Sequence, residues 1–270
     1  MVANSKERLD PVEFGRRLLT TGDLDPLYIA LWEAKIPRSQ LCCWLLSYFC
    51  FYNAGLSCWI TSQEDYWEAM RRVPASGTEF PRGAERRHFR GNFAIKAIHR
   101  LSETYPDPTA LIAWLGEAGP SAKPIMSRVK SLYGFGEWIS WKVPDICERL
   151  GVMNAQFVDE DCRLMFSSSL KGAAEISAKY GLKGDPVWAG HRYLMRKLGT
   201  LKAPPSYDRY INVQETETIC CKWHSHMGGH YPVGKDTEDI KHSLLRYQES
   251  SIAQQMLIPI TRLESDLCRQ

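Results

Sequence analysis

The stretch KSLYGFGEWISWKVPDICERLG, residues 130–151, holds two glycines one residue apart between two segments of helical pattern. The residues before it, SAKPIMSRVKSL, predict one helix, and EWISWKVPDICERLG predicts a second. Pro144 lies inside the second segment, where a proline bends or splits a helix. The stretch therefore predicts two helices joined by the tight turn YGFG, which is a helix-hairpin-helix.

Glycines in such a turn let successive backbone N–H groups point outward, where they can bind a phosphate oxygen. A helix that begins at the turn adds the positive end of its dipole. Gly134, Phe135 and Gly136, with Lys130 beside them, are therefore candidates for phosphate contact. The alternative is a plain connection between helices. A dinucleotide site is disfavoured, because its fingerprint needs a preceding strand and a third glycine.

The rest of the chain also favours helices. Helical spacing of apolar residues recurs in FAIKAIHRL, ALIAWL, VWAGHRYLMRKL and IKHSLLRY, and no run alternates in the manner of a strand. Asp107 and Asp185, each before a proline, predict helix starts, and Thr61 three residues before Glu64 predicts a capping box. We therefore expect an all-α fold of ten or more helices.

The amino-acid composition limits the class of protein to which the chain can belong. The 270 residues are 44% hydrophobic and carry a formal net charge of +3, which suits a folded chain and does not by itself indicate a polyanionic partner. Nine cysteines, an odd number, follow a polar N-terminal stretch without a secretory pattern, so we expect reduced thiols and a cytoplasmic protein. Residues 39–63 lack charge, but scattered polar residues favour a central core helix over a membrane span.

The proline-rich segment LKAPPSYDRY, residues 201–210, is the clearest joint in the chain. It predicts a helical core over residues 1–200, with the hairpin at about 123–150, and a C-terminal helical layer over 201–270 that packs on the core, with a single domain as the alternative.

The segment LYGFG, residues 132–136, resembles the L-P-G-V-G hairpin of helix-hairpin-helix DNA glycosylases. Those enzymes carry a catalytic aspartate about twenty residues later, in a V-D-x-x-x-x-R-like stretch, and this chain has VDEDCR at 158–163. The resemblance implies a glycosylase-like helical architecture and a catalytic Asp159. Trp138 stands where bifunctional glycosylases have a nucleophilic lysine, so no Schiff-base lyase is expected. Lys142, one turn further on, is a candidate cation.

Three longer segments, GFGEWISWKVPDICERLG, APPSYDRYINVQETETICCKW and GGHYPVGKD, resemble the phage amino acid:DNA transferases, also described as α-glutamyl/putrescinyl thymine pyrophosphorylases. The resemblance implies thymine hypermodification in double-stranded DNA. A free amino acid or polyamine would displace pyrophosphate from 5-pyrophosphoryloxymethyl-uracil, with no membrane partner. The leaving pyrophosphate needs positive charge from Lys or Arg, backbone amides or Mg²⁺, and no cofactor is assigned.

Residues 81–100, PRGAERRHFRGNFAIKAIHR, contain six basic residues and one acidic residue, a local charge of +5. Such a cluster suits phosphate groups, and the alternative is a solvated basic helix face. We assign Arg86 and Arg87 to pyrophosphate and Arg90 to DNA. Phe89 and Phe93 of the same stretch are expected in the core.

Acids are needed to accept a proton from the incoming ammonium. Asp159 and Asp161 are the candidates after the hairpin, with helix capping as the alternative for either. Glu217, on a predicted helix NVQETETICCKWHSH, is a further candidate.

The segment CCKWHSHMGGHYPVGKDT, residues 220–237, allows three interpretations. Its cysteines and histidines could bind zinc, but no C-x-x-C pair accompanies them. Its G-x-x-x-x-G-K pattern resembles a P-loop, but Asp236 stands where Ser or Thr is required. We favour a phosphate-facing loop with Lys235 as the pyrophosphate partner and Asp236 as a base or a helix cap.

Two rival functions stay open at this point. A monofunctional glycosylase would use Asp159 to support attack of water at C1′ of the sugar, and a non-enzymatic module would use the hairpin and the arginines to bind DNA alone.

Overall fold

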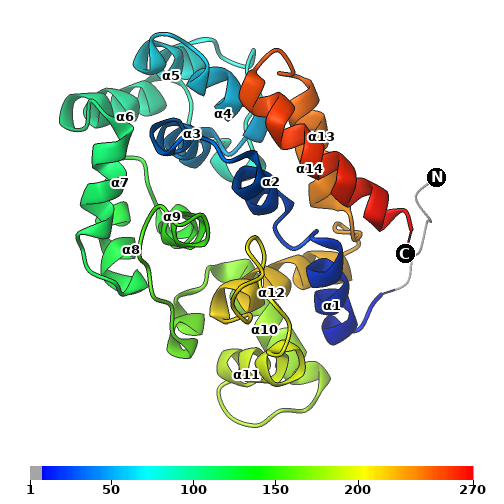
Figure 1. Cartoon of the computed structure of the whole chain (residues 1–270). Coiled ribbons are helices and arrows are strands. Elements are labelled where there is room, and N and C mark those ends of the chain that lie inside the picture. The colour runs from blue at the N-terminus through cyan, green and yellow to red at the C-terminus, as the bar shows by residue number, and fades with distance from the viewer. Residues whose placement is uncertain (1–7, 270) are drawn as a thin grey trace. The chain divides into compact units, whose positions relative to one another are not determined.

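The computed structural model describes residues 8–269. Within them the chain forms fourteen α-helices and two short 3₁₀ helices, and the only β-type pairing is an isolated bridge between Lys202 and Tyr210 (Figure 1). The expectation of an all-α fold with ten or more helices is confirmed. The likeness to the glycosylase architecture stays a prediction.

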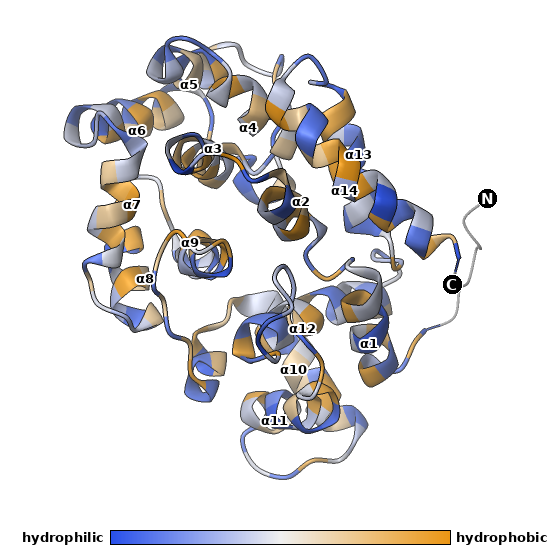
Figure 2. Ribbon diagram, in the orientation of Figure 1, coloured by the Kyte–Doolittle hydropathy of each residue, from blue (hydrophilic) through white to orange (hydrophobic). Residues whose placement is uncertain are grey.

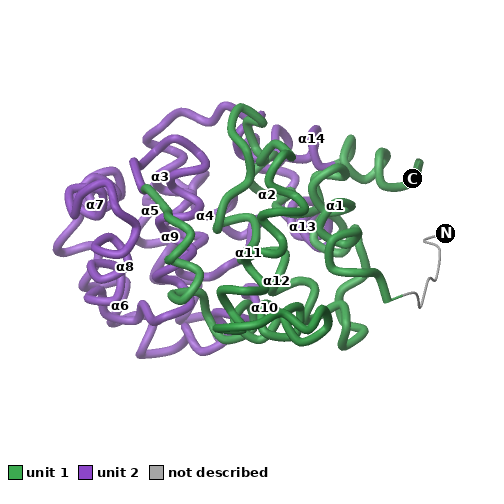
Figure 3. Tube along the Cα trace, turned by 90° about the horizontal axis from the view of Figure 1, so that it is seen from below, with its two compact units in different colours: residues 1–29, 156–238, 261–270 green, residues 30–155, 239–260 purple. Residues whose placement is uncertain are grey.

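The helices group into two compact units, each assembled from segments distant in sequence (Figure 3). Unit 1 contains residues 1–29, 156–238 and 261–270, and unit 2 contains residues 30–155 and 239–260. The joint predicted at 201–210 is a loop between two helices of unit 1, and the division of the chain at residue 200 stays a prediction.

Unit 1 is built around five elements, with three further helices running from one unit into the other. The five are α1 (Pro11–Thr21), η2 (Asp159–Leu164), α10 (Ser167–Lys179), α11 (Pro186–Leu198) and α12 (Val213–Met227). The three are α2 (Pro26–Ala34), α13 (Lys235–Leu245) and α14 (Ser251–Leu267).

Glycines set the close packing inside unit 1. A Cβ added to Gly172 of α10 would lie 2.1 Å from the carbonyl oxygen of Cys220 on α12. A Cβ on Gly190 of α11 would lie 2.0 Å from the carbonyl oxygen of Ala173 on α10. No side chain fits at such distances, so these two positions let the three helix backbones approach one another directly.

Unit 2 carries the hairpin and the basic segment. Its elements are α3 (Arg38–Phe51), α4 (Ala54–Thr61), α5 (Tyr66–Ala75), η1 (Ala84–Arg86), α6 (Gly91–Thr104), α7 (Pro108–Gly116), α8 (Ala122–Ser131) and α9 (Glu137–Arg149). Hydrophobic residues dominate α7 (Figure 2). Its apolar side chains Leu111, Ile112 and Leu115 are buried.

The charge-free segment 39–63 forms two helices rather than the single core helix expected. Tyr52 has a positive φ of 50°, which ends α3, and the Asn53 side chain accepts from the Leu56 N–H to begin α4. Residues 41–51 of α3 are buried except Cys43, as expected for a core element. No helix in the described part of the chain has the length and apolarity that crossing a membrane requires.

The predicted helix caps have mixed outcomes. Asp107 and Asp185 each accept a hydrogen bond from a backbone N–H in the first turn of α7 and α11, as predicted. The capping box at Thr61 is wrong, because Thr61 ends α4 and Asp65 caps α5 instead. Asp65 is the residue directly before the apolar periodicity begins, which is where a cap is expected.

Candidate active site

The hairpin forms as predicted within unit 2. Gly134 has a φ of 88°, a conformation that favours glycine, and the Phe135 N–H donates to the Leu132 carbonyl at 3.0 Å to close the turn. Gly136 is the N-cap of α9, and no atom lies within 4 Å of the position a Cβ would take there. The turn therefore offers open space at its backbone. Helix α9 continues through Pro144 and is not split.

Arg86 lies under the hairpin rather than on the surface. Its side chain is 2% exposed and donates from Nε to the Cys50 carbonyl and from Nη1 to the Gly134 carbonyl, both at 3.1 Å. The guanidinium also lies 4.4 Å from the Phe89 ring centroid and 5.3 Å from that of Phe135. Burial lowers the pKa of Arg86. The residue therefore braces the turn, a role that its place in a basic run did not indicate.

The remaining basic residues of segment 81–100 divide by exposure. Arg82 donates to two backbone carbonyls, whereas four others are exposed: Arg87, Arg90, Lys96 and Arg100. Lys96 and Arg100 lie 5.6 Å and 4.5 Å from the ring centroid of Tyr133 in the hairpin turn. Phe93, expected in the core, is 39% exposed and lies 5.3 Å from Tyr133, so that expectation is wrong. The helix turns Phe93 away from its buried neighbours Ala94 and Ala97.

Two candidate lysines flank the turn. Lys130 of α8 pairs with Glu137 at the start of α9, with 2.5 Å between Nζ and Oε2. Lys142 is largely buried, and its Nζ lies 4.0 Å from Oδ2 of the fully buried Asp145. Arg149 approaches the other oxygen of Asp145 at 3.9 Å. This charged row was not among the sequence predictions, although spacings of three and four residues place all three on one helix face.

Asp159 lies in unit 1, where it begins η2 and is followed by Glu160 and Asp161. Its Oδ2 accepts a hydrogen bond from Nη1 of Arg192 at 2.9 Å, and its Oδ1 lies 3.5 Å from Nε2 of His191. His191 is fully buried, and its Nδ1 is 2.8 Å from the Thr216 hydroxyl. Burial lowers the pKa of His191, and the charge of Asp159 acts against this. The Asp159 side chain is 32% exposed, so one group of this cluster can meet a solute.

Neither His191 nor Arg192 was among the residues predicted from the sequence. The available signal was a histidine on the buried stripe of VWAGHRYLMRKL, where an apolar residue is expected. A second cation shares a neighbour with Arg192, since the guanidinium carbons of Arg163 and Arg192 both lie 5.5 Å from the Trp188 ring centroid. The partly exposed Asp159 carboxylate is thus paired with Arg192, which shares the Trp188 ring with Arg163.

The other two predicted acids of this region are more enclosed. Oδ2 of Asp161 accepts from the Val158 N–H at 3.0 Å, which is the capping role weighed as the alternative. Glu217 is fully buried and accepts from the Ser169 hydroxyl at 2.6 Å. Both carboxylates have structural contacts, and their catalytic roles stay predictions.

The loop before α13 binds a carboxylate of the chain itself. The Gly234 and Thr237 N–H groups donate to Asp23 at 2.6 Å and 3.0 Å, and the Thr237 hydroxyl donates to it at 2.8 Å. Asp236 pairs with the buried Lys222 at 2.7 Å. Burial raises the pKa of Asp23, with Lys222 acting in the opposite direction. Backbone amides that resembled a phosphate loop are therefore satisfied internally, and helix α12, not a strand, precedes them.

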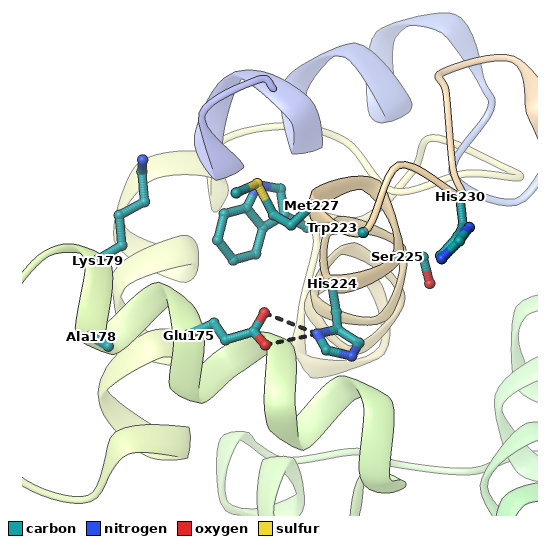
Figure 4. A pocket seen from close by; sticks show the side chains of 9 residues that line it. Glu175, Ala178, Lys179, Trp223, His224, Ser225, Met227 and His230 are labelled. Atoms are coloured by element: carbon teal, nitrogen blue, oxygen red, sulfur yellow. Dashed lines mark hydrogen bonds and ion pairs between the residues drawn. The ribbon is translucent and has the colours of Figure 1, made fainter. Parts of the chain in front are cut away.

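Of the histidines of segment 220–237, His226 bonds through Nδ1 to the Tyr231 carbonyl at 2.8 Å, whereas His224 and His230 line one surface groove. His224 bonds through Nδ1 to both oxygens of Glu175 at 2.9 Å, on a surface groove that Trp223, Met227 and Lys179 also line (Figure 4). No group of three His, Cys, Asp or Glu side chains in the described residues is placed to hold a metal ion.

Comparison with known proteins places the chain in a family. The family model described as amino acid:DNA transferase matches residues 9–231. The chain is 33% identical to a glycinyltransferase of Pseudomonas phage PaMx11, over 93% of this chain and 95% of that protein. It is 30% identical to a putrescinyltransferase of Delftia phage PhiW-14, over 86% of this chain and 77% of that protein. The chain belongs to the amino acid:DNA transferase family and is a transferase of DNA modification.

Proposed function

We propose that this transferase replaces pyrophosphate on 5-pyrophosphoryloxymethyl-uracil in double-stranded DNA with an amine. The observation that carries the proposal is the partly exposed carboxylate of Asp159, held between the His191 imidazole and the Arg192 guanidinium. A carboxylate there can accept N–H groups of an incoming ammonium. The cations beside it can receive an amino acid carboxylate or the leaving pyrophosphate.

The DNA strand is proposed to lie on the hairpin. The open backbone at Gly136 and the exposed Arg87, Arg90, Lys96 and Arg100 support this, because exposed cations next to accessible amides suit strand phosphates. Arg87 stays a proposed pyrophosphate ligand. Arg86 is better explained as the brace of the turn, because two carbonyls and two aromatic rings already surround it.

The loop residues keep a more limited role in this proposal. Lys235 is the first residue of α13 and stays a proposed pyrophosphate partner. Asp236 is committed to Lys222, so we place it in the support of the loop rather than in proton transfer.

The co-substrate is proposed to be a free amino acid or polyamine, with Mg²⁺ an additional source of charge to be tested. The relatives named glycinyltransferase and putrescinyltransferase make glycine and putrescine the first two amines to try. Arg192 beside Asp159 favours glycine, because its guanidinium can pair with the carboxylate of an amino acid. We place the reaction in the cytoplasm of an infected host.

The test is incubation of the protein with a duplex carrying 5-pyrophosphoryloxymethyl-uracil, in the presence of glycine, putrescine or no amine, with and without Mg²⁺. Amine-dependent pyrophosphate release, with a nucleoside whose mass includes the amine, is the expected result. The same duplex with thymine is the control. Abasic sites would instead support a glycosylase, and binding without turnover would support a DNA-binding module.

A further inference from the structure

A buried nitrogen without a hydrogen-bond partner faces the candidate acid of unit 1. Nε2 of His191 is inaccessible to solvent, lies 3.5 Å from Oδ1 of Asp159 and makes no hydrogen bond. We propose, on the basis of the function proposed above, that His191 acts through Asp159 and does not itself touch the substrate. It receives on Nε2 the proton that Asp159 takes from the incoming ammonium.

The neighbouring hydroxyl fixes which nitrogen carries hydrogen. The Thr216 hydroxyl donates its single hydrogen to the Val213 carbonyl at 3.1 Å. With its hydrogen placed there, the same oxygen accepts from Nδ1 of His191, 2.8 Å away, and we assign the ring hydrogen to Nδ1 on this basis. A neutral imidazole has one N–H, which leaves a lone pair on Nε2. That lone pair faces the Asp159 carboxylate, and one proton between the two groups would complete a hydrogen bond.

The charges around the imidazole favour the neutral ring at rest. Asp159 and Glu160 of η2 act to protonate it, whereas Arg192 of its own helix and, above all, its burial act against protonation. Thr216 of α12 offers only an acceptor. The imidazole is therefore neutral at rest and lies behind the partly exposed Asp159 carboxylate. It accepts a proton once the carboxylate has gained one.

The difference in base strength between a carboxylate and an imidazole explains why a second proton acceptor is useful here. A carboxyl group and an imidazole differ by about 2.6 pKa units in water, and an alkyl ammonium is a far weaker acid than either conjugate acid. Burial lowers the pKa of His191 and narrows this difference, while the negative charge of Asp159 acts against the narrowing. An isolated carboxylate would return the proton to the amine at once. Transfer to the imidazole retains the proton long enough for the amine to react.

The step balances in atoms and charge. The ammonium nitrogen loses one proton through Asp159 to Nε2 of His191, which becomes an imidazolium. The freed nitrogen lone pair forms the bond to the 5-methylene carbon, and the carbon–oxygen bond breaks with its electron pair on pyrophosphate. The product is a secondary ammonium, and His191 then releases its proton to solvent or to the departing pyrophosphate.

Two substitutions separate proton storage from packing. His191→Asn keeps a donor near the Nδ1 position for Thr216 and removes Nε2, whereas His191→Gln places an amide near Nε2 that can hold Asp159 but cannot store a proton. We expect both to lower kcat with glycine at pH 7 by at least about tenfold. His224→Asn, on the groove of the same unit, is the control and should keep wild-type turnover. If His191→Gln restores full activity, the imidazole only orients Asp159 and the proposal is overturned.

The pH profile and a weakly basic amine give readouts that a packing defect would not move. The deficit of His191→Asn should shrink as pH rises, because solution then supplies free amine. Hydroxylamine, largely unprotonated at neutral pH, should react in the variant within about threefold of wild type. An equal deficit at every pH and with both amines would overturn the proposal.

The tautomer can be measured without any substrate. ¹⁵N NMR of the wild-type protein should show His191 with hydrogen on Nδ1 and none on Nε2 at pH 7. Asp159→Asn should lower the pKa of the imidazole further, because a charge that favours protonation is removed. Hydrogen on Nε2 in the wild type would overturn the inference. An absence of amine transfer by wild type would instead refute the proposed function while leaving this measurement intact.

Discussion

Asp159 is the residue on which the proposed chemistry depends most directly. Asp159→Asn keeps the size of the side chain and removes its negative charge, so turnover with glycine should fall at least about tenfold while the thermal unfolding midpoint changes little. Glu160→Gln changes an exposed carboxylate one position away and is the matched control. Steady-state pyrophosphate release measures both variants. Full activity in Asp159→Asn would remove the residue from the mechanism.

Asp23 is a buried residue that holds the start of α13 through its hydrogen bonds. It accepts hydrogen bonds from the loop before α13 and lies near the buried Lys222, so Asp23→Ala leaves several donors unsatisfied. We expect a loss of about 3–5 kcal/mol in the free energy of unfolding, measured by urea denaturation. Glu238→Gln, exposed in the first turn of α13, should cost less than about 0.5 kcal/mol. Equal costs would show that the carboxylate does not organise the loop.

Lys222 gives this cluster a pH dependence. Burial acts to lower the pKa of Lys222, but the charges of Asp236 and Asp23 outweigh it and raise the pKa above 10.5. A raised pKa in the folded state means that the stabilisation is complete below about pH 10.5 and is lost as pH rises through the folded value. Urea unfolding between pH 9 and 12 should show a steeper loss in wild type than in Lys222→Met. Parallel curves would contradict this.

In the hairpin, substitutions at two glycines separate an effect on folding from an effect on the proposed DNA binding. A Cβ on Gly134 would lie 2.9 Å from Phe89 and would force a side chain into a φ of 88°. Gly134→Ala should therefore lose about 1–3 kcal/mol of stability. Gly136 has a φ of −109° and open space, so Gly136→Ala should fold normally.

DNA binding by Gly136→Ala should be weaker than wild type, even though its folding is normal. The methyl group in Gly136→Ala occupies the space where we propose that a strand phosphate approaches the backbone. DNA affinity at fixed salt, measured by fluorescence anisotropy, should fall several-fold without a change in stability. Unchanged affinity in a folded Gly136→Ala would place the DNA elsewhere.

Across the whole molecule, sequence patterns predicted the features that neighbouring residues form among themselves. The caps at Asp107 and Asp185 and the hairpin turn each involve a few neighbouring residues, so their signals survive folding. The contact of Asp159 with Arg192 joins positions 33 apart, and that of Asp23 with Gly234 joins positions 211 apart. Such contacts depend on how helices pack, and no spacing rule encodes them. The candidate acid was therefore predictable, and its partners were not.

The cysteines allow a prediction for the whole chain. All nine are free thiols, and in the described structure only Cys268 is exposed. Burial raises the pKa of Cys50 and Cys58 to about 12 and that of Cys43 and Cys162 to about 11. Because the thiolate is the reactive species, iodoacetamide at pH 7.5 should modify Cys268 well before the other eight, as read by peptide mass spectrometry.

Activity after this alkylation decides whether a cysteine takes part in the reaction. A thiolate that added to C6 of the uracil could assist loss of pyrophosphate, but high thiol pKa values oppose that role. We expect the protein with one adduct to transfer amine at the wild-type rate and Cys268→Ser to take up no early adduct. Inactivation that tracks modification of a buried cysteine, and that substrate DNA prevents, would contradict the expectation and identify a covalent nucleophile.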